Sequence, residues 1–158
     1  MTVPSSATGS ISVAYYNQNN NSVVSESGRG YTRDNRIKPD IAAGGVNATV
    51  IKPGGGIGLA TGGSVAGAVV AGGCALILQW AIVNKNQQAI YTSQVKSYII
   101  AGADTRSGDI YPNREWGYGI FNLNGIFDNI KEVYEEKSRK IKVYGNDRYE
   151  EYNVGNLD

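Results

Sequence analysis

A serine that directly follows two glycines is the residue of this sequence best suited to chemistry. Gly62, Gly63 and Ser64 form a glycine–serine corner at the start of a long apolar run. A serine hydroxyl attacks a carbonyl only when a base removes its proton and donors stabilise the oxyanion. At the start of a helix, Ser64 would offer an unpaired backbone N–H and a favourable helix dipole. Serine is also a common helix N-cap, so the residues alone leave its role open between nucleophile and cap.

No base for such a serine is evident within the chain. The sequence contains no histidine, which excludes a self-contained Ser-His-Asp or Cys-His site and argues against a zinc site. A Ser-Lys dyad with Lys85 or Lys96 has no motif behind it, so a solvated surface position is expected for both lysines. Cys74, the single cysteine, lies in the apolar run, where a buried, inert thiol is expected. The glycines at 54–56 lack the Lys-Ser/Thr ending of a phosphate loop, and no cofactor or metal is expected.

The composition describes one globular domain followed by a charged tail. The 158 residues suffice for one domain with a core. The 15 basic and 14 acidic side chains nearly cancel, so neither nucleic acid nor an anionic membrane is indicated as a partner. The 28 residues from Lys131 onward carry 13 of these 29 charges. We therefore expect residues 131–158 to form a solvated helix and hairpin-like tail, with a turn at "GND".

The strands and helices that must position Ser64 can be predicted from the periodicity of apolar residues and from the positions of the glycines. Three segments rich in β-branched and aromatic residues are expected to be strands: 11–16, 22–27 and 41–51, the last interrupted by two glycines. Residues 52–63 are expected to be a glycine-rich loop that leads to Ser64. An amphipathic helix is predicted over 87–103 and ends at Gly102. A further helix is predicted within 120–140, with Asn122 or Asn124 as its cap.

The apolar run over residues 65–83 admits two interpretations. Its 19 residues approach the roughly 20 that a bilayer span needs. Its first half, however, is alanine, glycine and valine, and no basic cluster flanks the run. Small residues spaced at i, i+4 mark a dimer face in membranes and a central helix surrounded by sheet in soluble α/β proteins; here they are Gly67 with Ala71, and Ala68 with Gly72. We predict the buried soluble helix and keep the membrane-anchored protein as a lower alternative.

Three blocks of the sequence together resemble the carboxy-terminal part of a subtilisin-like serine peptidase (subtilase). The segment "SGRGYTRDNRIKPDIAAGGVNA" (27–48) is similar to the family's serine-glycine turn, Lys-Pro-Asp strand and Pro-Gly-Val-Asn turn. The segment "GGSVAGAVVAG" (62–72) stands in the place of the Gly-Thr-Ser nucleophile motif and its helix. The segment "EWGYGIFNLNGIF" (115–127) is similar to the Gly-Tyr-Gly closing motif. Within the family, "CALILQWAIV" and "SGDIYPNREWGYG" look most like the clostridial Csp germination proteins.

The resemblance implies a fold and a site. It implies an α/β fold, the carboxy-terminal portion of a subtilisin-like three-layer domain over residues 1–130, with parallel strands and a buried central helix starting at Ser64. It implies that Ser64 is the nucleophile whose backbone N–H contributes to the oxyanion hole, with Gly62 and Gly63 as motif glycines. Asp40 is then structural. Csp relatives act on protein or peptide substrates, among them a cortex-hydrolase zymogen, and are associated with spores.

Departures from the family pattern put activity in doubt. Gly44 stands where the family has proline, Gly63 where it has threonine, and Ala68 where it often has proline. The family's Asp, His and oxyanion Asn lie upstream, so we expect a truncated chain, a fragmentary gene product or one part of a split protein. The missing half of the domain would then be a partner, and the chain alone would be inactive and either marginally stable or self-associating. A Csp-type pseudoprotease that acts by binding or signalling is the alternative to a peptidase.

Overall fold

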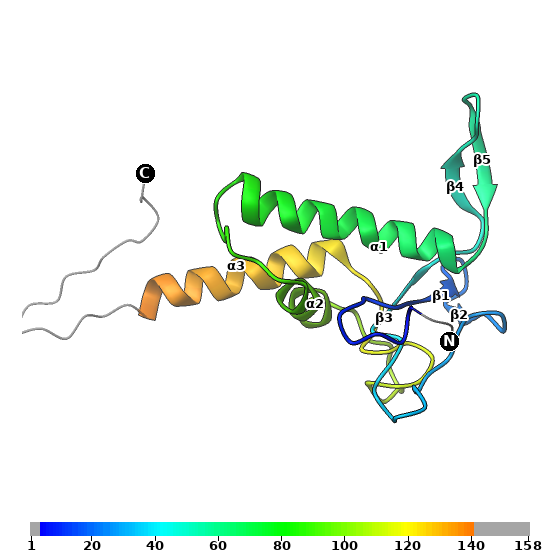
Figure 1. Ribbon diagram of the computed structural model, residues 1–158, viewed down its shortest axis with the longest axis horizontal. Coiled ribbons are helices and arrows are strands. Elements are labelled where there is room, and N and C mark those ends of the chain that lie inside the picture. Colours follow the sequence, from blue (N-terminus) through cyan, green and yellow to red (C-terminus); the bar gives the residue numbers. More distant parts are fainter. Residues whose placement is uncertain (1–3, 141–158) are drawn as a thin grey trace, which may run out of the picture.

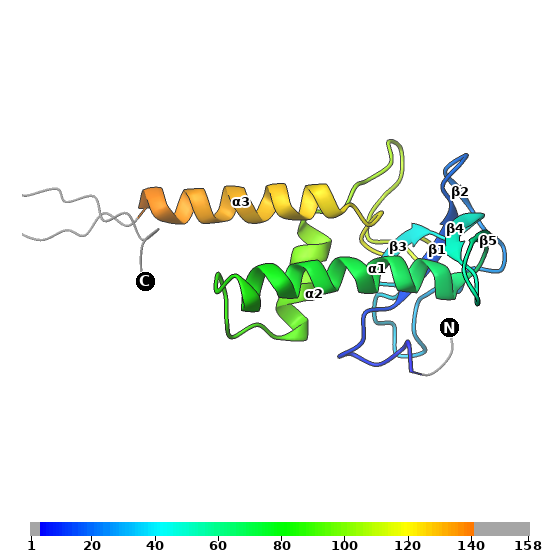
Figure 2. The same ribbon diagram turned by 90° about the horizontal axis from the view of Figure 1, so that it is seen from above.

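The computed structural model describes residues 4–140 and combines strands with helices, as the sequence predicts. The elements in chain order are β1 (Val13–Asn17), β2 (Ser22–Val23), β3 (Ile41–Gly44), β4 (Ala48–Ile51), β5 (Ile57–Ala60), α1 (Gly63–Leu78), the π-helical turn η1 (Gln79–Val83), α2 (Thr92–Ala101) and α3 (Leu123–Lys140). Figure 1 shows α1 lying across one side of the small sheet, with α3 running beneath it. Figure 2 shows α1 and α3 running in roughly the same direction, and α2, which packs against α3, crosses them at a steep angle on the side away from the viewer.

The central sheet has the strand order β2-β1-β3, and β1 pairs with β3 in parallel. Its register places Val13 opposite Ile41 and Tyr16 opposite Gly44. A single bridge between Ala42 and Ile120 adds the segment before α3 beside β3. Because side chains alternate along a strand, one face of the sheet packs against α1 and the other packs against Trp116. The mixed α/β fold class expected from the sequence is confirmed.

The segment from 41 to 63 differs from the sequence prediction. The predicted strand over 41–51 ends at Gly44, because the chain leaves the sheet and begins a separate hairpin of β4 and β5. The predicted loop over 52–63 therefore contains β5. Three glycines in succession, 54–56, have φ values of 81°, 98° and 84° and supply the turn, since positive φ is easily adopted only by glycine. The hairpin projects from the amino end of α1 in Figure 1.

Helix α1 is the expected central helix, and one face of it is buried. The buried positions recur at helical spacing, and they are Ala66, Val70, Gly73 and Ile77, followed by Ala81 in η1. This face packs on β1 and β3, where small side chains allow a close approach. The helix and η1 together form a segment from Gly63 to Val83 that is long and apolar enough to cross a membrane by length and composition alone. Only 28% of the most apolar 18-residue stretch of this segment is buried by the described residues. The outer side of the helix therefore lies open.

The two later helices confirm the predicted end and cap signals. Helix α2 begins at Thr92, later than the predicted start at 87, and it ends at Ala101 with Gly102 as its C-cap, as predicted. A Cβ on Gly102 would lie 2.3 Å from the backbone of Ile126 in α3. Asn122 caps α3, because its Oδ1 accepts a hydrogen bond of 3.1 Å from the N–H of Gly125. Helix α3 reaches Lys140, and the predicted hairpin beyond it lies outside the described residues. Glycine at 102 and asparagine at 122 thus fix how α2 and α3 meet.

Candidate active site

Ser64 lies exposed in the first turn of α1, next to the carboxyl end of β1 and β3. The helix begins at Gly63, one residue before the predicted start, and its N-cap is Gly62 with φ 147° and ψ 169°. No side chain caps this helix end, so Ser64 does not act as the N-cap. Within the described residues, neither the hydroxyl nor the backbone N–H of Ser64 has a hydrogen-bond partner. Both groups are therefore available at the surface.

The corner that holds Ser64 is fixed by contacts with the end of the sheet. The N–H of Gly62 donates to the carbonyl of Gly45 over 2.8 Å, which ties the corner to the residue after β3. A Cβ on Gly45 would lie 2.8 Å from the Cβ of Tyr15 and 2.9 Å from the carbonyl of Gly62. Only glycine at 45 allows this approach, since real Cβ contacts do not occur below 3.0 Å. The ring of Tyr15 also lies directly beneath Gly63.

Side-chain hydrogen bonds hold the neighbouring turn in place. Thr61 Oγ1 accepts a hydrogen bond of 2.8 Å from the N–H of Asn47. Gln18 Oε1 accepts one of 3.1 Å from the N–H of Val46, and its Nε2 donates to the carbonyl of the same residue. Asn47 has a φ of 50°, a left-handed conformation that asparagine tolerates better than most residues. Hydrogen bonds from two different segments of the chain thus fix Val46 and Asn47, two consecutive residues of the turn.

This arrangement presents a hydroxyl and one N–H donor at the positive end of a helix dipole. Unpaired N–H groups in the first turn favour a negative charge that develops beside them. An acyl-transfer site also requires a base and, as a rule, a second oxyanion donor. The chain has no histidine, and neither lysine considered above can serve. Lys85 follows η1 at the far end of the helix, about 30 Å from Ser64 at 1.5 Å per residue.

Lys96 is engaged elsewhere, which corrects the expectation of a solvated surface position. Its Nζ lies 3.0 Å from Asp40 Oδ1, and its side chain is 19% exposed. Lys38 Nζ lies 2.6 Å from Asp40 Oδ2, with both side chains almost fully buried. Asp40 Oδ2 also accepts from the N–H of Ser12 at 2.7 Å. Both ammonium groups donate to the carbonyl of Ser10. The cluster joins the segment before β3, helix α2 and the segment before β1, so Asp40 is structural, as expected.

Burial shifts two pKa values in directions that favour neutral groups. Burial lowers the pKa of Lys38, and this effect outweighs the opposing attraction of Asp40. Burial raises the pKa of the half-buried Cys74 thiol. Because thiolates are the reactive form of cysteine, the raised pKa agrees with the inert thiol that the sequence predicts.

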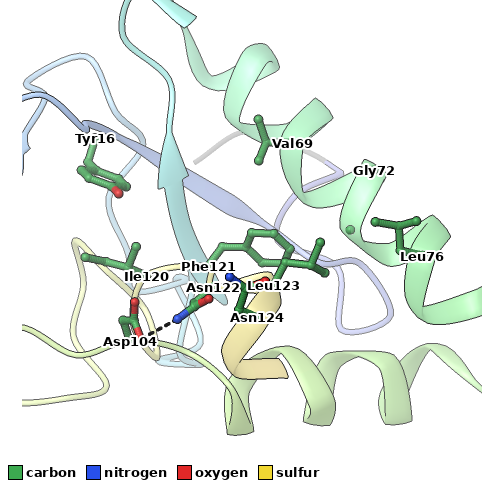
Figure 3. A pocket seen from close by; sticks show the side chains of 11 residues that line it. Tyr16, Val69, Gly72, Leu76, Asp104, Ile120, Phe121, Asn122, Leu123 and Asn124 are labelled. Carbon is green, nitrogen blue, oxygen red and sulfur yellow. Dashed lines mark hydrogen bonds between the residues drawn. The ribbon is translucent and has the colours of Figure 1, made fainter. Parts of the chain in front are cut away.

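A groove that the sequence did not predict lies beside α1. It has a volume of about 600 Å³. Its walls come from Val69, Gly72 and Leu76 of α1, and Phe121 lies below them, as Figure 3 shows. At its polar end, Asp104 Oδ1 accepts a hydrogen bond of 2.9 Å from Asn122 Nδ2. No local pattern could reveal this groove, because its two sides lie about fifty residues apart in the sequence.

Comparison with known proteins places these features in a family. The model of the subtilase family (Peptidase_S8) matches residues 1–119. The structure of the Clostridium perfringens CspB protease is similar with a TM-score of 0.77 and 37% identity, over 82% of this chain and 28% of that one. The prenylagaramide maturation protease PagA is similar with a TM-score of 0.65 and 25% identity, over 80% of this chain and 44% of PagA.

A third solved structure shows the same fold at lower identity. The patellamide maturation protease PatA gives a TM-score of 0.67 at 24% identity, over 82% of this chain and 46% of PatA. This chain therefore spans less than half the length of each of these three structures. The comparison with curated proteins yields no match.

Proposed function

This chain belongs to the subtilase family, and from that premise we propose that it carries the nucleophile, Ser64, and one oxyanion donor of a serine endopeptidase site. The exposed Ser64 hydroxyl and its unpaired N–H, both at the amino end of α1, carry this proposal. Gly62 and Gly63 leave the space in front of the serine open, which permits a substrate backbone to approach closely. The substrate class is a protein or peptide.

The base and the second oxyanion donor come from a part of a peptidase domain that this chain does not supply. The chain has no histidine, and it spans 28% of the CspB protease to which it is similar. The partner in our proposal is therefore the complementary portion of a subtilase domain. Without it, the Ser64 hydroxyl keeps its proton at neutral pH and is a weak nucleophile. The chain alone is then inactive.

A pseudoprotease is the second candidate function, and Gly63 favours it. Glycine stands at 63 where the motif of the family carries threonine, so the corner has lost a side chain that would restrict it. In this alternative the chain binds a partner protein rather than cleaving it. In both cases we propose a Csp-like role in spore germination, with a cortex-hydrolase zymogen as the substrate or partner. A membrane span over 65–83 has less support, because the inner face of α1 packs on β1 and β3.

Activity of a chimeric protease distinguishes the peptidase from the pseudoprotease. The matching segment of the C. perfringens CspB protease is replaced by residues 4–140 of this chain, and hydrolysis of a quenched peptide is measured. We expect the Ser64→Ala chimera to lose activity by about 10⁶-fold, as other subtilases do without their nucleophile. Ser25→Ala, at an exposed loop serine, is the matched control and should retain full activity. A folded chimera that is no more active than its Ser64→Ala variant would establish the pseudoprotease instead.

A further inference from the structure

The turn between β3 and β4 is joined to the end of β1 by a side chain. Backbone pairing of β1 with β3 ends at Tyr16, which lies opposite Gly44 and whose carbonyl accepts a hydrogen bond of 3.1 Å from the N–H of Gly45. One residue beyond β1, the side chain of Gln18 continues the contact. Its carboxamide carries both an acceptor and a donor, and it pairs with the N–H and with the carbonyl of Val46. The side chain thus holds a peptide that the strand itself does not reach.

We propose that Gln18 is a positioning residue for Ser64, on which it acts through the turn over residues 45–47. Its carboxamide fixes one residue of this turn, and the turn in turn fixes the glycine corner before the serine. That the reaction of Ser64 depends on Gln18 rests on the function proposed above. That Gln18 holds the corner does not.

The two neighbours of Val46 both bind the corner. The carbonyl of Gly45 accepts a hydrogen bond of 2.8 Å from the N–H of Gly62. The N–H of Asn47 donates one of 2.8 Å to Oγ1 of Thr61. Because peptide units are planar and nearly rigid, a displacement of Val46 moves both of its neighbours. The two hydrogen bonds then carry that displacement to the residues that precede the serine.

The corner is joined in the same way to the first turn of α1. The carbonyl of Gly62 accepts hydrogen bonds from the N–H groups of Val65, at 3.1 Å, and Ala66, at 3.3 Å. Ser64 lies within this turn, and no side chain caps it. The backbone of the turn therefore sets the position of the serine. Precision matters here, since misplacing a reacting group by about 1 Å can slow a reaction about 100-fold.

Glycine at 44 leaves the space that the Gln18 side chain occupies. The backbone of Gly44 does not have a positive φ, so its conformation does not require glycine. A Cβ at this position would lie 3.1 Å from the Cβ of Gln18 and 3.2 Å from its Oε1. Contacts below 3.4 Å are tight enough that the neighbouring atoms must shift. A side chain at 44 would therefore push the carboxamide away from Val46, and the two residues form a pair.

The turn after β1 directs Gln18 towards this partner. Oδ1 of Asn17 accepts a hydrogen bond of 3.0 Å from the N–H of Asn19, which closes an Asx turn around residue 18. Gln18 itself is exposed. Its two hydrogen bonds replace hydrogen bonds to water, so they add little to the free energy of unfolding. The contact is thus suited to fix a position and contributes little to folding.

Hydrogen exchange of the whole chain, followed by mass spectrometry, tests the contact without reference to activity. Gln18→Met keeps the length of the side chain and removes both hydrogen bonds. Peptides that cover residues 44–48 and 61–66 should exchange at least about 10-fold faster in this variant, because the turn then opens more easily. Asn19→Ala, which removes an exposed neighbouring amide whose side chain makes no hydrogen bond within the described residues, should exchange like the unaltered chain. Equal exchange in Gln18→Met would overturn the proposal.

Steady-state kinetics of the chimera described above tests the effect on Ser64. Gln18→Met should lower kcat about 10-fold and change KM by less than about twofold, because a reacting group is displaced and the substrate contacts remain. The unfolding midpoint in urea should not move, whereas a merely structural role would lower it. Gln18→Glu keeps the acceptor for the N–H of Val46, so its kcat should lie between the two. An active chimera in which Gln18→Met and Asn19→Ala have the same kcat would show that Gln18 does not position the serine.

An inactive chimera would count against the proposed peptidase and not against the contact. Exchange alone would then decide whether Gln18 holds the corner.

Gly44→Ala tests whether the glycine serves Gln18. Its added Cβ should displace the carboxamide and reproduce the faster exchange of Gln18→Met. Because both substitutions break the same contact, a variant that carries both should exchange no faster than either alone, whereas independent effects would multiply. Multiplied effects would overturn the pairing of Gly44 with Gln18.

Discussion

Asp40→Ala is expected to lower the free energy of unfolding by about 3–5 kcal/mol, the usual effect of removing one partner from a buried ion pair. The carboxylate is shared by Lys38 and Lys96, which approach its two oxygens within 2.6 Å and 3.0 Å. Its loss leaves two ammonium groups facing each other in a largely buried site. Since domains of this size are stabilised by only about 5–15 kcal/mol, much of the stability would be lost. Urea unfolding followed by circular dichroism measures the effect.

Two variants keep that result interpretable. Asp34→Ala removes a carboxylate whose partner, Arg36, lies at 2.7 Å on the exposed surface; the unfolding midpoint should not move, because exposed pairs contribute little. Asp40→Asn retains an oxygen for the N–H of Ser12 but removes the charge. The unfolding midpoint of Asp40→Asn should lie between those of Asp40→Ala and the unaltered chain. If Asp40→Ala unfolds at the same urea concentration as Asp34→Ala, the buried cluster does not stabilise the fold.

Gly62→Ala is expected to slow the reaction of Ser64 in the active chimera by about 100-fold, the usual cost of misplacing a reacting group by 1 Å. The backbone at 62, with φ 147° and ψ 169°, is a conformation that only glycine adopts without strain of about 1–3 kcal/mol. The carbonyl of Gly62 accepts from the N–H groups of Val65 and Ala66, so a shift at 62 displaces the first turn of α1. The second-order rate of modification by a fluorophosphonate reports the effect.

The matched control for this variant is Gly9→Ala. A Cβ at Gly9 would meet nothing within 4 Å, and its backbone does not require glycine. The control should react at the rate of the unaltered chimera. Equal rates for Gly62→Ala and Gly9→Ala would show that the glycine corner does not position Ser64.

The sequence predicted those elements whose signals are local. The β-branched and aromatic run before Asn17 gives β1, Gly102 ends α2, and Asn122 caps α3. Each depends on the chemistry of one or a few neighbouring residues. The motif around Ser64 placed the serine at the start of the long helix to within one residue.

Features that depend on distant contacts could not be predicted in the same way. Lys96 has the polar character of a surface residue, yet Asp40, which lies 56 positions earlier, draws it into a buried cluster. The glycines at 54–56 suggested a loop, but β4 and β5 pair across them. Helix α1 is apolar on every side, so its sequence does not reveal which side the sheet covers. Its open outer side became visible only with β1 and β3 in place.

Intact-mass analysis after exposure to a fluorophosphonate tests most directly whether Ser64 is a nucleophile that lacks its base and its second oxyanion donor. The chain is treated alone, and again with the rest of the C. perfringens CspB protease supplied as a second polypeptide. We expect no adduct on the chain alone and one adduct, on Ser64, in the mixture, with none on Ser64→Ala. An adduct on the chain alone, or none in a mixture that has formed a stable complex, would contradict the proposed site.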